Sequence, residues 1–251
     1  MQRRAFLTTI AGTVGAIAGC LGDSNRSLPA EPDGDWSQRS HDRRNTGAAD
    51  VTVPKRGNRA WEAGSAGSIE PLVADGTVFS VGPSVTALDA QTGEQEWEYE
   101  LSAQSGPTPA LTDDYLVVPM GHRLVALNRD DGSEQWTTEL PRPAEKAVTV
   151  DSSVAVVPLA ARQGTSGLIA FDTATGERLW EHSTLAASPA AIADTRVFVT
   201  GYRQDGETGI LQALSRADGS LLWERELAHP DTEPVGADGE LLVADEGTLA
   251  V

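Results

Sequence analysis

Cysteine is nearly absent from this 251-residue chain, which contains only Cys20. A single thiol can form no intrachain disulfide, so the fold must be held together by packing alone. The same scarcity excludes the Cys-x-x-Cys-His motif of a covalently attached haem and zinc sites built from several thiolates. The chain is nevertheless long enough for one sizeable core or one closed β-architecture.

Basic residues are also scarce. Lysine and arginine total 19 against 37 aspartates and glutamates, which gives a net charge of −18, and only Lys55 and Lys146 are lysines. Such a surface repels phosphates, so we expect no nucleic-acid partner. High negative charge with few lysines resembles the proteins of extreme halophiles, which stay soluble at molar salt. An ordinary acidic secreted protein is the alternative.

Motifs for catalysis and metal binding are missing as well. The histidines His41, His122, His182 and His229 show no metal-ligand spacing such as His-Glu-x-x-His. No serine has a Gly-x-Ser-x-Gly setting, and no Gly-x-x-x-x-Gly-Lys loop is present for phosphates. We therefore expect no enzyme, and no catalytic, cofactor-binding or metal-binding residues.

The first 19 residues are typical of an export signal. Arg3 and Arg4 precede an apolar run from Ala5 to Leu21 that carries no charge. Phe6 and Leu7, at their spacing from the two arginines, resemble the twin-arginine signal. That route would carry the protein out of the cytoplasm already folded.

Small residues at positions 17–19 precede Cys20, an arrangement that resembles a lipobox. The resemblance implies that Cys20 is lipidated and anchors the protein to membrane lipid on the extracytoplasmic face. An uncleaved anchor helix with an incidental thiol is the alternative, because roughly 17–20 apolar residues can span a bilayer. Residues 20–35 lack apolar periodicity and predict a flexible tether with an r.m.s. span of roughly 20 Å.

From residue 36 onward the chain contains an internal repeat. Four segments align without a gap, each with a glycine four residues and an alanine ten residues before a tryptophan, and these tryptophans recur at intervals of 39, 44 and 43 residues. The repeats cover about 69–101, 108–140, 147–184 and 188–228. Their glycine and tryptophan pairs are Gly93 and Trp97, Gly132 and Trp136, Gly176 and Trp180, and Gly219 and Trp223.

Each repeat carries four strand signals. In the second repeat they are 108–113, 115–120, 123–129 and the segment of Trp136, separated by polar turns. In an Asp-x-x-Thr-Gly turn the aspartate can accept hydrogen bonds from the following backbone, and the glycine can adopt a positive φ. Four short antiparallel strands at a period of about 40 residues predict an all-β fold, a β-propeller of four-stranded blades.

The pattern Ala-Leu-Asp-x-x-Thr-Gly-x-x-x-Trp resembles the pyrroloquinoline-quinone repeat, also called the tryptophan-docking repeat, over about residues 59–251. Trp36 with residues 45–47 resembles the lead-in of that family, whereas Ser215 replaces the aspartate in the fourth copy. The resemblance implies that the tryptophans wedge between neighbouring blades; a ligand box is the alternative.

Quinone-dependent dehydrogenases of this repeat type are much longer than this chain and have eight blades. They hold the quinone and a calcium ion over the central axis, commonly beside a vicinal disulfide, which this chain cannot form. The resemblance therefore implies the fold and does not imply the enzyme.

The two ends of the repeat region are incomplete in complementary ways. Residues 59–64, with Trp61, predict a final strand without a blade before it, and residues 233–251 predict three strands without a fourth. Together they would form a composite closing blade, giving five blades in a propeller over 36–251 without open sheet edges. The alternative is an incomplete propeller.

Two segments, 162–167 and 203–209, join the second and third strands of their blades and are longer than the equivalent 82–84. They should lie on one face and are candidate binding loops, or else solvated hairpin extensions. Asp205 and Glu207 could ligate calcium, although they do not complete a calcium-loop pattern.

These features together predict an exported, lipid-anchored propeller that acts as a non-catalytic binding or scaffold module at the cell surface, for another envelope or surface protein. The alternatives are a redox protein that binds a quinone or a metal, and a truncated propeller.

Overall fold

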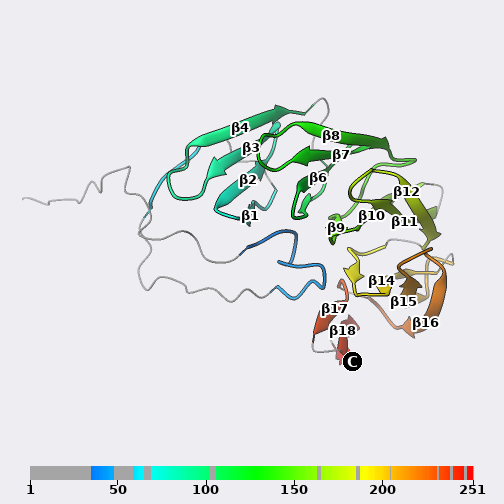
Figure 1. Ribbon diagram of the computed structural model, residues 1–251. Helices are drawn as coiled ribbons and strands as arrows, with labels where there is room; N and C mark the ends of the chain where they lie inside the picture. Colours follow the sequence, from blue (N-terminus) through cyan, green and yellow to red (C-terminus); the bar gives the residue numbers. More distant parts are fainter. Residues whose placement is uncertain are drawn as a thin grey trace, which may run out of the picture.

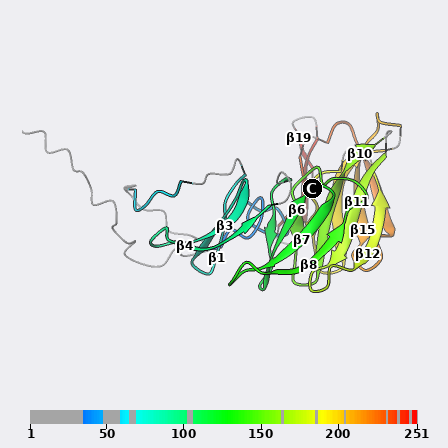
Figure 2. The same cartoon turned by 90° about the horizontal axis from the view of Figure 1, so that it is seen from above.

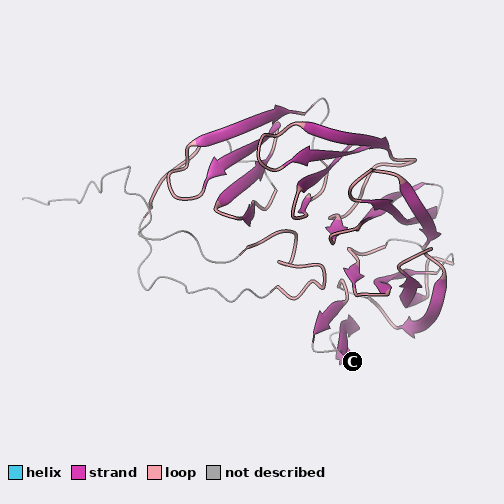
Figure 3. Ribbon diagram, viewed as in Figure 1, coloured by secondary structure: helices cyan, strands magenta, loops and turns pink. Residues whose placement is uncertain are grey.

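Antiparallel β-strands form all the regular secondary structure in the described part of the computed structural model (Figures 1 and 3). The structure describes residues 35–47, 59–64, 69–101, 106–162, 165–184, 187–203, 205–230, 232–237, 240–245 and 248–250. Within these ranges no helix is long and apolar enough to cross a membrane.

Five sheets follow one another along the chain, and in each the strands pair in sequence order. The first contains β1 (Leu72–Ala74), β2 (Thr77–Val81), β3 (Ser84–Asp89) and β4 (Gln95–Glu100). The second contains β5 (Ala110–Leu111), β6 (Tyr115–Met120), β7 (Arg123–Asn128) and β8 (Glu134–Glu139). The third contains β9 (Thr149–Val150), β10 (Val154–Arg162), β11 (Thr165–Asp172) and β12 (Arg178–Ser183). The fourth contains β13 (Ala191–Ile192), β14 (Arg196–Tyr202), β15 (Gly209–Ser215) and β16 (Leu221–Leu227), and the fifth contains β17 (Val235–Ala237), β18 (Glu240–Asp245) and β19 (Thr248–Ala250).

This arrangement confirms the predicted fold class: the protein is an all-β chain with four four-stranded antiparallel blades, and its fifth sheet has three described strands. The four strands expected in the second repeat are present as β5 to β8. The first of them is shorter than expected, because only Ala110 and Leu111 pair with β6.

The repeated alanine has a structural reason. Ala87 lies directly opposite Trp97 across the β3–β4 pair, and the equivalent pairs are Ala126 with Trp136, Ala170 with Trp180, and Ala213 with Trp223. The register of each strand pair shifts immediately after the alanine, as at a β-bulge. A bulge increases the local twist and redirects the neighbouring side chains, and here it adjoins the large indole in each of the four four-stranded blades.

Apolar residues fill the space between neighbouring sheets. One cluster joins the first and second sheets and includes Phe79, Leu116 and Met120, all at most 2% exposed. Equivalent clusters join the second sheet to the third and the third to the fourth. Seen from above, the sheets of the second to fourth blades stand side by side (Figure 2). Strands that are apolar on both faces, such as β6, are therefore explained by sheets that pack on two sides.

The five sheets follow an arc, with residues 35–47 on its inner side (Figure 1). Residues 59–64 contain no strand, and the described pairings join β19 to β18 only. The composite blade expected from 59–64 and 233–251 is thus not among the pairings of the described residues. Closure of the ring and the number of blades remain predictions.

Over its described residues, the segment 162–167 follows the second of its two expectations, a hairpin extension. β10 extends to Arg162 and β11 begins at Thr165, and these two residues pair with each other. Only positions 163 and 164, which lie outside the described residues, connect the strands. The segment is therefore mostly an extension of the hairpin, because its backbone continues the ladder between two long strands.

Candidate functional site

The tryptophans on the outer strands lie against turns of the following blade. The ring of Trp97 lies so close to Gly132 that a Cβ added there would be 2.5 Å from its Cε3. The indole Nε1 of Trp97 donates a hydrogen bond of 2.8 Å to the carbonyl oxygen of Arg129 in the same turn. Gly132 has a φ of +71°, which side chains rarely tolerate. The turn therefore requires glycine for its backbone conformation and for the space that the ring occupies.

The same contact is repeated along the arc. Trp61, Trp136 and Trp180 lie against Gly93, Gly176 and Gly219, and their indoles donate to the carbonyl oxygens of Ala90, Thr173 and Arg216. Because Trp61 contacts the first blade as the other tryptophans contact theirs, residues 59–64 occupy the position that the outer strand of a preceding blade would take.

Trp223, on β16, has different surroundings. Its side chain is 37% exposed, and its ring lies beside Phe198 with 6.0 Å between the ring centroids. Leu221 and Leu222 on the same strand are 48% and 49% exposed. The other indoles are received by the turn after the third strand of the next blade. In the fifth sheet the described strands end with the third, β19, so the equivalent turn is not in the described part of the chain.

The turns themselves are ordered by the aspartate of the repeat. The Oδ1 atom of Asp89 accepts hydrogen bonds from the backbone amides of Gln91 and Thr92 and from the Thr92 hydroxyl. These bonds, chiefly those from Thr92, hold the pKa of Asp89 below its usual value. In the fourth blade, where Ser215 replaces the aspartate, Asp218 accepts from the amide and the hydroxyl of Ser220 instead.

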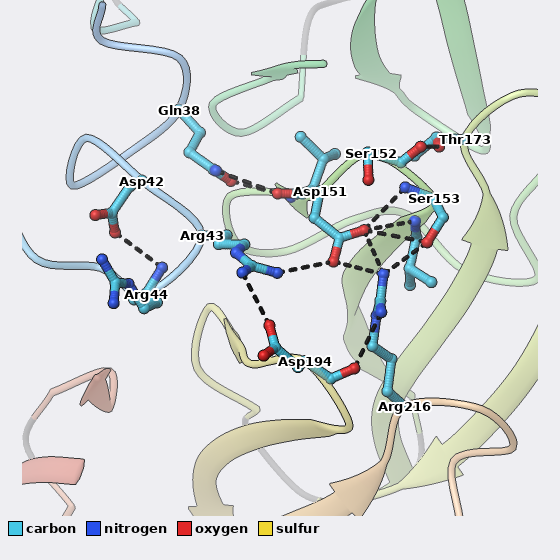
Figure 4. A network of polar contacts seen from close by, with 12 residues as sticks. Gln38, Asp42, Arg43, Arg44, Asp151, Ser152, Ser153, Thr173, Asp194 and Arg216 are labelled. Atoms are coloured by element: carbon cyan, nitrogen blue, oxygen red, sulfur yellow. Dashed lines mark hydrogen bonds and ion pairs between the residues drawn. The ribbon is translucent and has the colours of Figure 1, made fainter. Parts of the chain in front are cut away.

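Ion pairs link consecutive blades on the same face as these turns (Figure 4). Arg216, from the fourth blade, contacts the carboxylate of Asp151 in the third at 2.6 Å, and Arg43 approaches the same carboxylate at 3.4 Å. The side chain of Asp151 is 5% exposed. Burial raises its pKa, but the amides of Ser153 and Val154 and the charge of Arg216 outweigh burial, so the pKa is lowered. Arg129 bridges the second blade to Asp75 of the first in the same way.

Residues 35–47, which we call the axial segment, bond to the innermost strand region of every sheet. Trp36 exchanges two backbone hydrogen bonds with Val73, and Leu111 donates to the Ser37 carbonyl. Ile192 and Gly236 donate to the carbonyl oxygens of Arg43 and Arg44. These contacts reach the first, second, fourth and fifth sheets.

Two buried amide side chains complete the contacts of the axial segment. Gln38 bonds to both the N–H and the C=O of Val150 in the third sheet, at 3.0 and 3.2 Å. Asn45 donates to the carbonyl oxygens of Ala190 and Pro234, before the fourth and fifth sheets. The inner side of the arc is therefore lined by the chain's own polypeptide, bonded to all five sheets.

The two ends of the blades carry different charges. One end of the blades bears the turns between first and second strands and those between third and fourth strands; we call it the turn face. The opposite end bears the other connections, and we call it the loop face. The described residues of the turn-face connections contain ten carboxylates, namely Asp75, Glu94, Asp113, Asp114, Asp130, Asp131, Asp151, Glu177, Asp194 and Asp218. They contain two basic residues, Arg129 and Arg216, both paired with aspartates. Arg43 of the axial segment adds a third basic group, because it pairs with Asp151 and Asp194.

The loop face is nearly balanced in charge. Its described connections contain four carboxylates and three basic residues, namely Glu145, Asp205, Glu207, Glu233, Arg142, Lys146 and Arg203. Glu70, which precedes β1, is a fifth carboxylate at this end. Arg39 of the axial segment adds a fourth basic group, because it pairs with Glu233 at 3.4 Å. The negative charge of the described turns and loops is thus concentrated on the turn face.

Two cavities open on the loop face. The first, of about 290 Å³, is lined by Arg39, Lys146, Ser188, Pro189, Thr200, Gly201, Tyr202, Pro230, Thr232 and Glu233. The second, of about 370 Å³, lies beside the loop after β14 and is lined by residues that include Tyr202, Arg203 and Asp205. Tyr202 contributes to both cavities, and its hydroxyl lies 3.0 Å from His229 Nδ1.

The carboxylate of Asp205 is used within its own loop. Its Oδ1 atom accepts hydrogen bonds from the amides of Glu207 and Thr208, and its Oδ2 atom accepts from the Thr208 hydroxyl. The Thr208 and Glu207 amides lower the pKa of Asp205. The described residues contain no group of three histidine, cysteine, aspartate or glutamate side chains that could hold a metal ion.

Several residues singled out in the sequence lie outside the described ranges. These are Cys20 and the signal residues Arg3, Arg4, Phe6 and Leu7. Sequence reasoning in turn missed Gln38, Lys146, Arg129 and Arg216. The two arginines could have been found from the repeat. Each follows directly after the position that is aspartate in the first and third repeats, which is Asn128 before Arg129 and Ser215 before Arg216.

The fold and the docked tryptophans define the class: a β-propeller built from pyrroloquinoline-quinone-type repeats. A family model described as "Outer membrane protein assembly factor BamB" matches residues 47–187 and 164–251. The chain belongs to this family. No curated protein sequence matches the chain.

Solved structures share the fold at low sequence identity. BamB from Moraxella catarrhalis is 18% identical, with a TM-score of 0.57 over 71% of this chain and 55% of its own. The quinohemoprotein alcohol dehydrogenase ADHIIG from Pseudomonas putida HK5 is 14% identical, with a TM-score of 0.65 over 90% and 49%. That of Comamonas testosteroni is 15% identical, with a TM-score of 0.61 over 85% and 48%. The chain spans about half the length of these proteins.

Proposed function

We propose that this protein is an exported, lipid-anchored propeller that acts as a non-catalytic binding or scaffold module for another protein at the cell surface. The axial segment is the observation that carries the non-catalytic part of this proposal. In dehydrogenases with such repeats the quinone is held over the central axis, whereas here Gln38 and Asn45 bond the axial segment to the inner strand regions of the sheets. Polypeptide thus lines the side of the blades that faces the axis.

The family supports a binding role in the envelope. The matching family model is described as an outer membrane protein assembly factor, and assembly depends on contacts between proteins. A rigid β-scaffold with loops and cavities on one face is suited to such contacts. Propeller folds also host enzymes, so the proposal rests on the axial segment and not on the fold alone.

The anchor is tested by a single substitution. Cys20 is the only cysteine, so Cys20→Ser removes the acceptor of the lipid and no other thiol. We expect the native chain to fractionate with membranes and to carry an acyl-bearing N-terminal residue in its mass spectrum. The Cys20→Ser chain should lose that mass. If the native chain carries an unmodified N-terminal cysteine or an uncleaved signal, the lipid anchor is wrong.

The non-catalytic role is tested against its redox alternative by spectroscopy. We expect native protein purified in molar KCl to be colourless above 300 nm and free of stoichiometric metal. A bound chromophore at one equivalent per chain, or one equivalent of calcium that survives dialysis, would favour the quinone- or metal-binding redox protein. The absorbance spectrum and elemental analysis of one sample distinguish the two functions.

A further inference from the structure

We propose that the loop face is the partner-binding face, and that its cavity between Arg39 and Lys146 receives a carboxylate side chain from an acidic segment of the partner protein. This inference rests on the proposed function and adds the face, the site and the chemistry of the partner. Three observations carry it: the charges of the two faces, the pairing of groups around the cavity, and the place where the axial segment begins.

The first observation is the difference in charge between the faces. The turn-face connections hold ten carboxylates against two arginines, with Arg43 of the axial segment as a third, and all three arginines are paired with aspartates. An acidic partner segment is repelled there, because like charges brought together disfavour association. On the loop face the described charges nearly balance, so a local cation can determine where an acidic segment binds.

The second observation concerns which groups in the cavity remain available. The Ser188 hydroxyl donates to the Pro189 carbonyl, and the Thr200 hydroxyl donates to the Thr232 carbonyl. Arg39 is paired with Glu233, which leaves part of its guanidinium exposed. Lys146 is exposed on the cavity wall and is the only lysine among the described residues. The ammonium of Lys146, reinforced by Arg39, is thus the group best placed to bind a carboxylate.

The third observation is the point at which the N-terminal tether joins the propeller. The first described residue, Asp35, accepts a hydrogen bond from the amide of Asp75 through its Oδ1 atom at 3.3 Å. Asp75 lies in a turn-face connection. A lipid anchor at Cys20, with a tether whose r.m.s. span is roughly 20 Å, would therefore attach on the turn face. The loop face is then the one directed away from the lipid surface.

The test uses site-specific photocrosslinking in the full-length lipoprotein, in native membranes. A photoreactive phenylalanine analogue replaces Thr232, an exposed residue of the cavity wall, or Asp130, an exposed residue of the turn face, as the matched control. We expect a defined partner adduct from position 232 and none from position 130. The crosslinked partner peptide, identified by mass spectrometry, should contain aspartate or glutamate next to the adduct.

Charge variants then test the cavity itself. With the probe at position 232, Lys146→Glu should lower the adduct yield at limiting partner about tenfold, as loss of a charge-assisted hydrogen bond predicts, whereas Lys146→Arg should retain it. Arg196→Glu, an equal charge reversal at an exposed site next to the turn face, should leave the yield unchanged.

The outcomes separate the two proposals. An adduct from position 130 only would refute the choice of face while the binding function stands. An adduct from position 232 that is indifferent to Lys146→Glu would refute recognition of a carboxylate. Absence of a protein adduct at both positions, in protein that fractionates with membranes, would refute the binding function together with this inference.

Discussion

The contact between Trp97 and Gly132 allows a quantitative test of how the blades are held together. Gly132→Ala would place a Cβ 2.5 Å from the indole, at a backbone φ of +71°. The positive φ alone costs about 1–2 kcal/mol for a residue with a Cβ. The indole must also move, which removes its hydrogen bond to Arg129, worth about 1 kcal/mol, and part of its burial, worth about another 1–2 kcal/mol. We expect a total destabilisation of about 3–5 kcal/mol.

Gly76→Ala is the matched control. Gly76 has a φ of +77° in another turn of the same face, but nothing lies within 4 Å of the position of its Cβ. It should therefore show only the backbone effect, about 1–2 kcal/mol. The assay is denaturant unfolding in molar KCl, followed by tryptophan fluorescence. Equal destabilisation by the two substitutions would refute the reasoning, because the ring contact would then contribute nothing beyond the backbone conformation.

Three further predictions concern the axial segment, the ion pairs and the exposed tryptophan. Gln38→Leu should destabilise the fold by about 2–4 kcal/mol in denaturant unfolding, because it leaves the backbone N–H and C=O of Val150 buried and unpaired. An unchanged stability would refute the role of the axial segment in holding the sheets together. Because the pKa of Asp151 is lowered in the fold, the ionised carboxylate should stabilise the fold above about pH 4, and this stabilisation should be lost as the pH falls further. The difference in unfolding free energy between the native chain and Asp151→Asn should therefore shrink in acid. A difference independent of pH would contradict this. Trp223→Ala should lower the free energy of unfolding by less than about 2 kcal/mol, whereas Trp97→Ala should lower it by about 3–5 kcal/mol, because Trp97 is the more buried. Similar losses of stability in thermal unfolding would show that Trp223 is docked as well.

The sequence by itself determined the blade, because the signals for a blade are local. The glycine of each turn, the polar residue four positions before it (Asp89, Asn128, Asp172 or Ser215) and the tryptophan four residues after it lie within one short segment, and their spacing does not depend on distant contacts. The turn chemistry at Asp89 and the alternation of strands and turns could therefore be predicted residue by residue. The lengths of β10 and β11 could not, because hairpin pairing carries strand structure into polar residues such as Arg162.

Only the tertiary structure decided what surrounds the axis and how the two faces differ. The axial segment has no apolar periodicity, and its register is set by bonds from Gln38 and Asn45 to backbone more than 100 residues away. The charge difference arises because antiparallel blades bring turns from all along the chain to one end, where aspartates spread through the sequence become neighbours. Lys146 and Tyr202 likewise line one cavity only because blades that follow one another in the chain lie side by side along the arc.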